Sequence, residues 1–141
     1  MIIEQARNLR NLIQEYAQKL EDKTLVIATS FYFEEWKPNS YNVGDVRTSN
    51  GKPYECIMSH DSTNNPTWDI SVRTLWKPYH SRKKEFALPW EQPTGSHDMY
   101  RTGEYMVYDG NTYLCKSDTN YSPTEYAQAW EVVQTAFEMG V

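Results

Sequence analysis

The stretch SYNVGDVRTSNGKPYEC, residues 40–56, returns in altered form as MYRTGEYMVYDGNTYLC, residues 99–115. A shift of 59 positions brings the glycines, the tyrosines and a cysteine of the two strings into register. Glycine recurs where the backbone needs a positive φ or cannot accept a Cβ atom, so matched glycines indicate a matched backbone. The repeat therefore predicts two small units of about the same shape. The matched residues are Tyr41 with Tyr100, Gly44 with Gly103, Gly51 with Gly110, Tyr54 with Tyr113 and Cys56 with Cys115.

Each string contains the sequence signal of a β-hairpin. The pairs Asn50-Gly51 and Asp109-Gly110 stand between short β-forming segments. Asn-Gly and Asp-Gly are strong hairpin signals because a type I′ turn needs a positive φ at both central residues. We therefore predict one hairpin in each unit.

The register of the hairpins predicts which side chains face the core. In the second copy a two-residue turn pairs Met106 with Tyr113, on the face that is predicted to pack in the core. In the first copy the same register places Arg47 beside Tyr54. Either Arg47 lies along that face with its charged head in water, or a bulge turns Val46 inward instead.

Four tryptophans flank the two copies and complete each unit. A chain of about 45 residues buries little apolar area, so dense aromatic packing must compensate. We predict a mainly β fold in which an N-terminal helix precedes two tandem small three-stranded β modules. The modules are assigned to residues 34–80 and 88–133, with a linker at 81–87 and a C-terminal tail at 134–141. The flanking tryptophans are Trp36, Trp76, Trp90 and Trp130.

Residues 1–23 are predicted to form a helix, because apolar residues recur at spacings of four and three. Such a seam either packs on its own domain or joins several copies as a short parallel coiled coil. We expect the oligomer, with a homotrimer favoured. The next stretch, TLVIATSFYF at 24–33, is rich in β-branched and aromatic residues and predicts an extended arm or strand. The seam residues are Ile2, Ala6, Leu9, Ile13, Tyr16 and Leu20.

Composition narrows the classes of function. The net charge of −5 argues against binding nucleic acid through its phosphates. Aromatic residues make up 14% of the chain, which is too much apolar surface for a disordered protein. We find no apolar run of the ~20 residues that a membrane-spanning helix needs, and no secretory signal at the N-terminus. We therefore expect that the protein does not insert into a membrane. We also expect that it is made in a cytoplasm.

The two cysteines, Cys56 and Cys115, occupy equivalent positions in the repeat. Each then belongs to its own module, and a bridge between them would require the two cores to face each other. We predict two reduced, buried thiols.

Catalytic and metal-binding patterns are weak in this sequence. The dipeptides His60-Asp61 and His97-Asp98 do not occupy equivalent places in the copies, and no further ligands appear at metal spacing. Glu34-Glu35 is a poor pair for glycoside cleavage, because adjacent strand residues point to opposite faces. Phosphate-binding glycine loops and zinc motifs are missing from the sequence. We predict a protein that is not an enzyme and holds no cofactor or metal.

Aromatic surface is then the main candidate for binding. Sugars stack their C–H faces on Trp and Tyr rings and exchange hydrogen bonds with nearby polar groups. Trp68 has no aromatic counterpart in the second copy and lies in a polar loop, so it is the preferred stacking ring. Polar neighbours would contact the sugar, and three tyrosines rank below Trp68. The candidate carbohydrate-binding residues are Trp68, Asn64, Asn65, Asp69, Tyr79, Tyr121 and Tyr126.

The ordered pattern of the first copy resembles the small chitin-binding modules of carbohydrate-binding families 5 and 12, and the second copy resembles a more diverged module. Those modules carry consecutive tryptophans after the second strand, where this chain has Met58 and Ser59. The layout of helix, aromatic arm and two modules is similar to small tail-associated proteins of phages and prophages in Gram-positive bacteria. The pattern consists of Trp36, Tyr41, Gly44-Asp45, Asn50-Gly51, Tyr54 and Trp76.

The resemblance implies a protein of the virion tail or baseplate, made in the host cytoplasm. Its expected role is to recognise host cell-surface polysaccharide or peptidoglycan without catalysis. The alternative is a structural adaptor of the tail, whose modules bind other phage tail proteins and have lost sugar binding.

Overall fold

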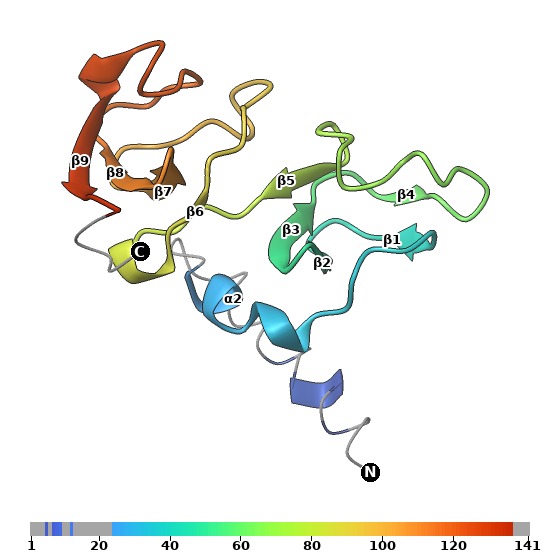
Figure 1. Ribbon diagram of the computed structural model, residues 1–141. Helices are drawn as coiled ribbons and strands as arrows, with labels where there is room; N and C mark the ends of the chain where they lie inside the picture. The colour runs from blue at the N-terminus through green and yellow to red at the C-terminus, as the bar shows by residue number, and fades with distance from the viewer. Residues whose placement is uncertain (1–4, 6, 10–11, 13–23, 137–141) are drawn as a thin grey trace. The chain divides into compact units, whose positions relative to one another are not determined.

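The two repeated strings form separate small sheets in the computed structural model, which describes residues 5, 7–9, 12 and 24–136 (Figure 1). The chain divides into two compact units, Met1–Tyr79 and His80–Val141. Strands predominate over helices in both, which confirms the mainly β class.

The first unit is built on a three-stranded antiparallel sheet with the order β2-β3-β5. Two shorter strands pair beside it, β1 with β4. Glu35 also bridges to Thr48 in parallel, so the segment before β1 runs along the free edge of β2. The strands are β1 (Ser40–Tyr41), β2 (Val46–Ser49), β3 (Lys52–Cys56), β4 (His60–Asp61) and β5 (Trp76–Pro78).

The first hairpin keeps the regular register through its turn. Asn50 and Gly51 have φ values of 52° and 78°, as a type I′ turn requires. Arg47 lies directly opposite Tyr54, and its Cζ stands 5.2 Å from the ring centroid of Tyr41. The regular register without a bulge is therefore observed, and Val46 is fully buried all the same. The guanidinium lies over an aromatic ring and not free in water as that alternative assumed.

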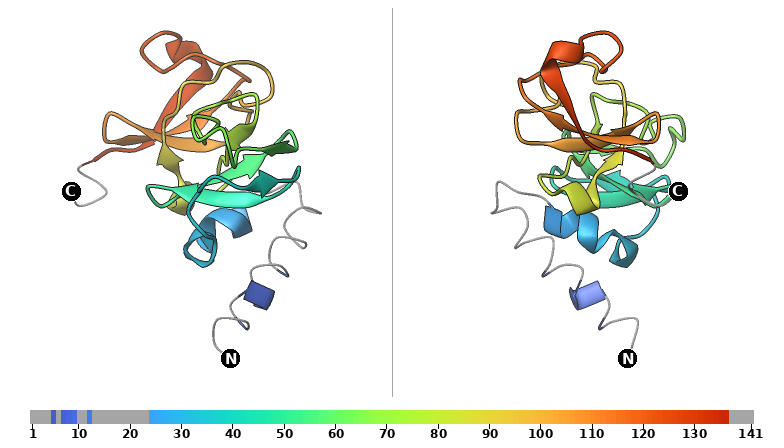
Figure 2. Two further views of the ribbon diagram at one scale, coloured as in Figure 1. Left: turned by 90° about the vertical axis from the view of Figure 1, so that its right-hand side faces the viewer. Right: turned by 60° about the vertical axis from the view of Figure 1, so that its left-hand side comes forward.

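The prediction of an extended arm at 24–33 is wrong. This stretch forms the short helix α2 (Thr24–Ala28) and a 3₁₀ turn, η1 (Ser30–Tyr32). Val26 and Ile27 of α2 are buried, and the helix lies against β3 (Figure 2). β-branched residues disfavour helices only weakly, so burial against the sheet overrides local propensity here.

The predicted N-terminal helix falls mostly outside the described residues. Residues 5, 7–9 and 12 are helical, and Leu9 is exposed. The other seam positions are not among the described residues, so the coiled coil and the homotrimer stay predictions. None of the helices that the structure describes is long and apolar enough to cross a bilayer.

The second unit is built on a four-stranded sheet with the order β6-β7-β8-β9, in which β6 is parallel to β7 and the rest is antiparallel. Met106 pairs with Tyr113, as predicted. Ser81 bridges to Tyr105, so the predicted linker 81–87 packs onto this unit. The elements are η2 (Lys84–Phe86), β6 (Leu88–Pro89), β7 (Tyr105–Tyr108), β8 (Asn111–Cys115), η3 (Ala127–Ala129) and β9 (Trp130–Gln134).

The sequence repeat is also a repeat of local structure. The same backbone hydrogen bonds recur 59 positions apart at the start of each hairpin. A bond at the parallel edge recurs as well, with its acceptor 59 positions on and its donor tryptophan 54 positions on. The bonds are Gly44 N to Cys56 O (2.9 Å) and Gly103 N to Cys115 O (2.9 Å), Cys56 N to Asp45 O (2.8 Å) and Cys115 N to Glu104 O (2.8 Å), and Trp36 N to Thr48 O (2.9 Å) and Trp90 N to Val107 O (2.8 Å).

Each unit has its own aromatic core with a cysteine in it. Cys56 and Cys115 are free, buried and on the second strand of their hairpins, which confirms the prediction. Each thiol donates to a main-chain carbonyl two residues on, at 3.2 and 3.1 Å. The core residues are Tyr41, Tyr54, Cys56, Ile70, Leu75 and Trp76 in the first unit, and Tyr100, Met106, Cys115, Ala129 and Trp130 in the second.

Candidate functional site

The predicted stacking ring of the first unit is at the surface. Trp68 is 43% exposed and lies in a loop of successive turns. Its backbone N–H donates to the carbonyl of Asn65. Asn64 is exposed and Asn65 is half-buried. The Asp69 carboxylate is already engaged, because it accepts hydrogen bonds from the backbone N–H and the hydroxyl of Ser71 at 2.9 and 2.5 Å. Trp68 is thus available for contact, while Asp69 holds the loop together.

Tyr79 is wrongly predicted as a binding residue. It follows β5, and only 5% of it is exposed. Burial, with a contribution from the Glu55 charge, raises the pKa of Tyr79 well above its usual range. A ring enclosed in this way packs in the interior and has no free face for a sugar.

The other two candidate tyrosines line the same pocket. Tyr121 and Tyr126 are 57% and 44% exposed, and both line one pocket of about 370 Å³ in the second unit. Two aromatic rings, carboxylates and an amide in one wall are the ingredients of a site for a polar ligand with an apolar face. The other lining residues are Met99, Asp118, Thr119, Asn120 and Glu125.

A tight loop positions the two tyrosines. Ser122 and Glu125 bond reciprocally, since each backbone N–H donates to the other's side-chain oxygen at 3.2 Å. Trp130 Nε1 donates to the Tyr121 carbonyl at 2.9 Å, which ties the loop to the buried core. The reciprocal pattern is that of a capping box, Ser-x-x-Glu. The string Ser122-Pro123-Thr124-Glu125 is therefore a sequence signal that could have drawn attention to this loop.

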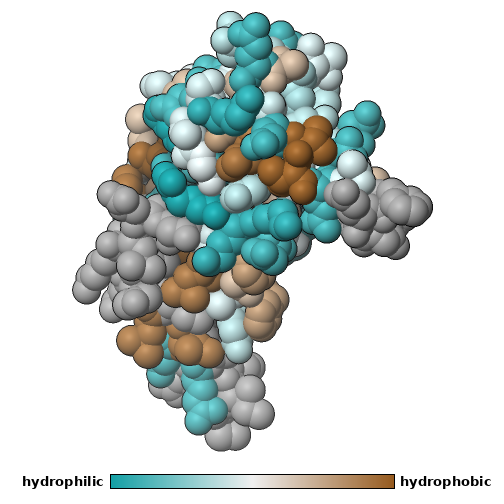
Figure 3. Space-filling model, turned by 90° about the vertical axis from the view of Figure 1, so that its left-hand side faces the viewer, coloured by the Kyte–Doolittle hydropathy of each residue, from teal (hydrophilic) through white to brown (hydrophobic). Residues whose placement is uncertain are grey.

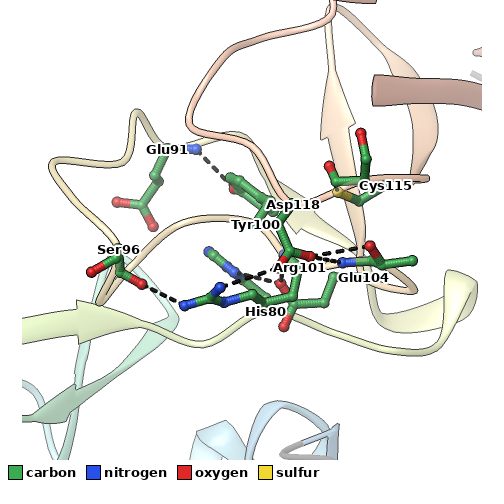
Figure 4. A network of polar contacts seen from close by, with 10 residues as sticks. His80, Glu91, Ser96, Tyr100, Arg101, Glu104, Cys115 and Asp118 are labelled. Atoms are coloured by element: carbon green, nitrogen blue, oxygen red, sulfur yellow. Dashed lines mark hydrogen bonds and ion pairs between the residues drawn. The ribbon is translucent and has the colours of Figure 1, made fainter. Parts of the chain in front are cut away.

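One wall of the pocket belongs to a polar network (Figure 4). Arg101 Nη1 donates to Asp118 Oδ2 at 3.1 Å, and Arg101 Nη2 donates to the Ser96 carbonyl at 2.8 Å. The backbone N–H of Thr102 donates to Asp118 Oδ1 at 2.8 Å. The Thr102 amide and the Arg101 guanidinium lower the pKa of Asp118, so its carboxylate is an anion at neutral pH.

The same network reaches the core through His80, which sequence reasoning missed. The imidazole stacks on the ring of Tyr100 with centroids 3.8 Å apart, and its Nδ1 lies 3.0 Å from Glu104 Oε1 (Figure 4). Glu104 Oε1 also accepts from the backbone N–H of Arg101 at 2.7 Å. These contacts hold the segment that leads from Tyr100 to the pocket wall.

The first unit has a hollow of similar size in a different place. A groove of about 360 Å³ lies beside Trp36, between the first hairpin turn and the loop after Trp68. Its lining is more polar than that of the tyrosine pocket and includes Ser49, Asn50 and Arg73. Among the described residues, we find no group of three or more His, Cys, Asp or Glu side chains that could hold a metal ion.

Comparisons with known protein families and curated sequences find no match. The resemblance to chitin-binding modules and to phage tail proteins therefore rests on the sequence pattern itself.

Proposed function

We propose that this chain is a non-catalytic carbohydrate-binding protein. The observation that carries the proposal is that two exposed tyrosine rings, Tyr121 and Tyr126, line one pocket. An exposed aromatic ring does not gain the free energy that burial in the fold would give. Such rings are typical of surfaces that bind a partner with an apolar face.

The chemistry of the pocket suits a sugar. A pyranose can stack its C–H face on a tyrosine ring, while its hydroxyls donate to carboxylate and amide oxygens. Asp118 and Glu125 provide carboxylate oxygens around the rings, and each carboxylate keeps lone pairs beyond the bonds that it accepts within the protein. The volume of about 370 Å³ falls in the range of small-ligand sites, about 300–1,000 Å³.

The sequence resemblance supplies the biological setting of the proposal. On that basis we propose that the protein belongs to the tail or baseplate of a phage of Gram-positive bacteria and that its ligand is host cell-wall polysaccharide or peptidoglycan. A single shallow site binds weakly, so several copies acting together would give useful affinity. The predicted homotrimer would provide those copies.

The test is binding to purified Gram-positive cell walls and to a glycan array. We expect the double variant Tyr121→Ala, Tyr126→Ala to lose at least tenfold in wall binding with little change in thermal stability. Phe86→Ala removes a ring of similar exposure outside the pocket and should bind like the unchanged protein. Full binding by the double variant would overturn the proposal for this pocket.

Trp68→Ala provides the corresponding test in the first unit. If Trp68 is a second stacking ring, wall binding weakens while the melting temperature is unchanged, because the side chain is largely outside the core. A drop in stability would instead show that the ring supports its loop.

A second candidate function is the structural adaptor. β9 is an edge strand of its sheet, and Val132 on it is 47% exposed. Figure 3 shows apolar patches bordered by hydrophilic residues on one face of the molecule. Exposed edges and apolar patches favour pairing with another protein. Capture of a tail protein by the chain, abolished by Val132→Asp and accompanied by no glycan binding, would favour this function.

A further inference from the structure

The first tryptophan of each unit is packed differently in the two units. Trp90 in the second unit is enclosed by rings: it stacks on Tyr100 at 5.0 Å and meets Tyr108 and Trp130 edge-on, both at 6.1 Å. Trp36, its counterpart in the first unit, is half-buried and lines the groove of about 360 Å³. Within the described residues, Trp36 makes no such ring contact, and its buried indole Nε1 has no hydrogen-bond partner.

The repeat identifies the side chain responsible. Ser49 and Tyr108 are equivalent, because each ends the first hairpin strand and pairs across the turn, with Lys52 and Asn111. The Tyr108 ring packs against Trp90 and also meets Tyr113 edge-on at 6.3 Å. Ser49 has no ring, and it lines the open groove. The groove therefore exists where the second unit has a tyrosine.

The groove is held open by side chains with partners of their own. Arg73 lies with its Cζ 5.2 Å from the Tyr54 ring centroid, and its Nη1 donates to the carbonyl of Ile70 at 3.3 Å. Asp69 is bonded to Ser71, as described above. The walls thus combine one indole face with a positioned guanidinium and small polar side chains.

We propose that the Trp36 groove is a second binding site, which takes one sugar residue of the glycan. The inference rests on the proposed function for the ligand class but not on the tyrosine pocket. The sugar stacks on Trp36 and accepts hydrogen bonds from donors on the groove wall, Arg73 and Asn50.

The test uses the molecule's own second unit as a template. Ser49→Tyr should fill the groove as Tyr108 does in the second unit, without loss of folding. Ser40→Tyr adds the same ring at an exposed position on β1 that does not line the groove, and serves as the matched control. The probe is a muramidase digest of purified Gram-positive cell walls, which contains soluble glycan fragments with their attached polymers.

The readout is the indole N–H cross-peak of Trp36 in a nitrogen–proton correlation spectrum, assigned by its disappearance in Trp36→Phe. We expect a saturable shift of this peak in the unchanged protein and in Ser40→Tyr, and no shift in Ser49→Tyr. Arg73→Ala removes a donor without adding bulk, and should raise the half-saturating digest concentration at least threefold.

Two outcomes separate this inference from the proposed function. If the digest shifts the Trp130 indole peak beside the tyrosine pocket but leaves Trp36 unmoved, the second site is refuted and the proposed function stands. If Ser49→Tyr is folded and the Trp36 peak still shifts, the groove is not the site. If the digest moves no peak in the unchanged protein, both proposals fail.

Discussion

The two units share a hairpin framework and differ in what lies against the equivalent tyrosine ring. In the second unit the imidazole of His80 stacks on Tyr100, with ring centroids 3.8 Å apart. In the first unit the guanidinium of Arg47 lies over Tyr41, with its Cζ 5.2 Å from the ring centroid. Together with the exchange of Tyr108 for Ser49, this leaves one aromatic core closed and the other open beside a groove. One hairpin framework therefore supports two different surfaces.

The hollows of the two units also differ in chemistry. The tyrosine pocket has two exposed rings and the carboxylates of Asp118 and Glu125, so it can accept hydrogen bonds from ligand hydroxyls. The Trp36 groove presents the guanidinium of Arg73, so it can donate hydrogen bonds to a ligand. It also contains the carboxylates of Glu35 and Asp69. A glycan offers both donors and acceptors, which makes the two sites compatible with one ligand.

The largest expected effect comes from the closing tryptophans. Trp76→Ala and Trp130→Ala each remove a buried indole from the only aromatic cluster described for its unit. Large-to-small changes of this kind cost about 3–5 kcal/mol. We expect each variant to lose most of the stability of its own unit, measured by urea unfolding followed by circular dichroism.

Trp76 and Trp130 also differ in hydrogen bonding, because only one of the two indole N–H groups has an acceptor within the described part of the chain. Trp130 Nε1 donates to the Tyr121 carbonyl, whereas Trp76 Nε1 has no partner in the described residues. Trp130→Phe should therefore loosen the tyrosine pocket and weaken wall binding, while Trp76→Phe should leave binding at that pocket unchanged. Equal binding by the two Phe variants would contradict the role given to the Trp130 hydrogen bond.

A smaller loss is expected for Tyr108→Ser, which gives the second unit the residue found in the first. The ring is half-buried, so the cost is about 2 kcal/mol, roughly half that of a fully buried aromatic residue. The variant also loses the 2.8 Å hydrogen bond between the Tyr108 and Thr124 hydroxyls. Chemical unfolding measures the cost, and increased solvent quenching of Trp90 fluorescence would report a newly opened groove. Unchanged stability and quenching would show that Tyr108 does not close the core.

At alkaline pH the titration of the two buried thiols should lower the stability of the folded protein. Burial, with smaller contributions from Glu104 and Asp118, raises the pKa of Cys115 from 9.0 to about 11, and burial also raises the pKa of Cys56. Between pH 9 and 11 the unfolded chain releases the Cys115 proton and the folded chain keeps it. The free energy of unfolding therefore falls as pH rises through this window.

Urea midpoints measured at pH 8 to 11 give the test of this titration. Cys115→Ala should flatten the decline relative to the unchanged protein, because the variant has no thiol to titrate at that position. Rapid alkylation of either thiol at pH 8 in the folded protein would contradict their burial.

Sequence reasoning succeeded where the signal was local. The Asn-Gly and Asp-Gly turns dictate the hairpins, and the alternation around them places Met106 opposite Tyr113 and the cysteines inside. It failed where burial against distant residues decides the outcome. Residues 24–28 form a helix that packs on β3, and Tyr79, directly after the core strand β5, is buried.

The candidate site shows the same division. Trp68 is exposed, as its polar loop suggested, but the pairing of Tyr121 with Tyr126 depends on a loop fixed by Ser122, Glu125 and Trp130. The groove beside Trp36 could not be predicted either, because it results from comparing packing in two folded units. A side-chain difference between Ser49 and Tyr108 is visible in the sequence, but its consequence requires the fold.

The smallest expected effect concerns the feature that the two units share most closely, their turns. Gly51 and Gly110 have φ values of 78° and 81°, a left-handed conformation that costs other residues about 1–2 kcal/mol. A Cβ added at Gly51 would meet nothing within 4 Å, and one at Gly110 would meet only the Ala136 side chain at 3.4 Å. Gly51→Ala and Gly110→Ala should therefore destabilise their units by similar amounts, about 1 kcal/mol each, since backbone conformation and not crowding sets the cost. Asn50→Gly is the control, because glycine also accepts the positive φ at that position. Urea unfolding of the three variants decides the matter: a neutral Gly→Ala change would refute the shared turn, and a much larger loss at Gly110 would show that the two hairpins are packed differently.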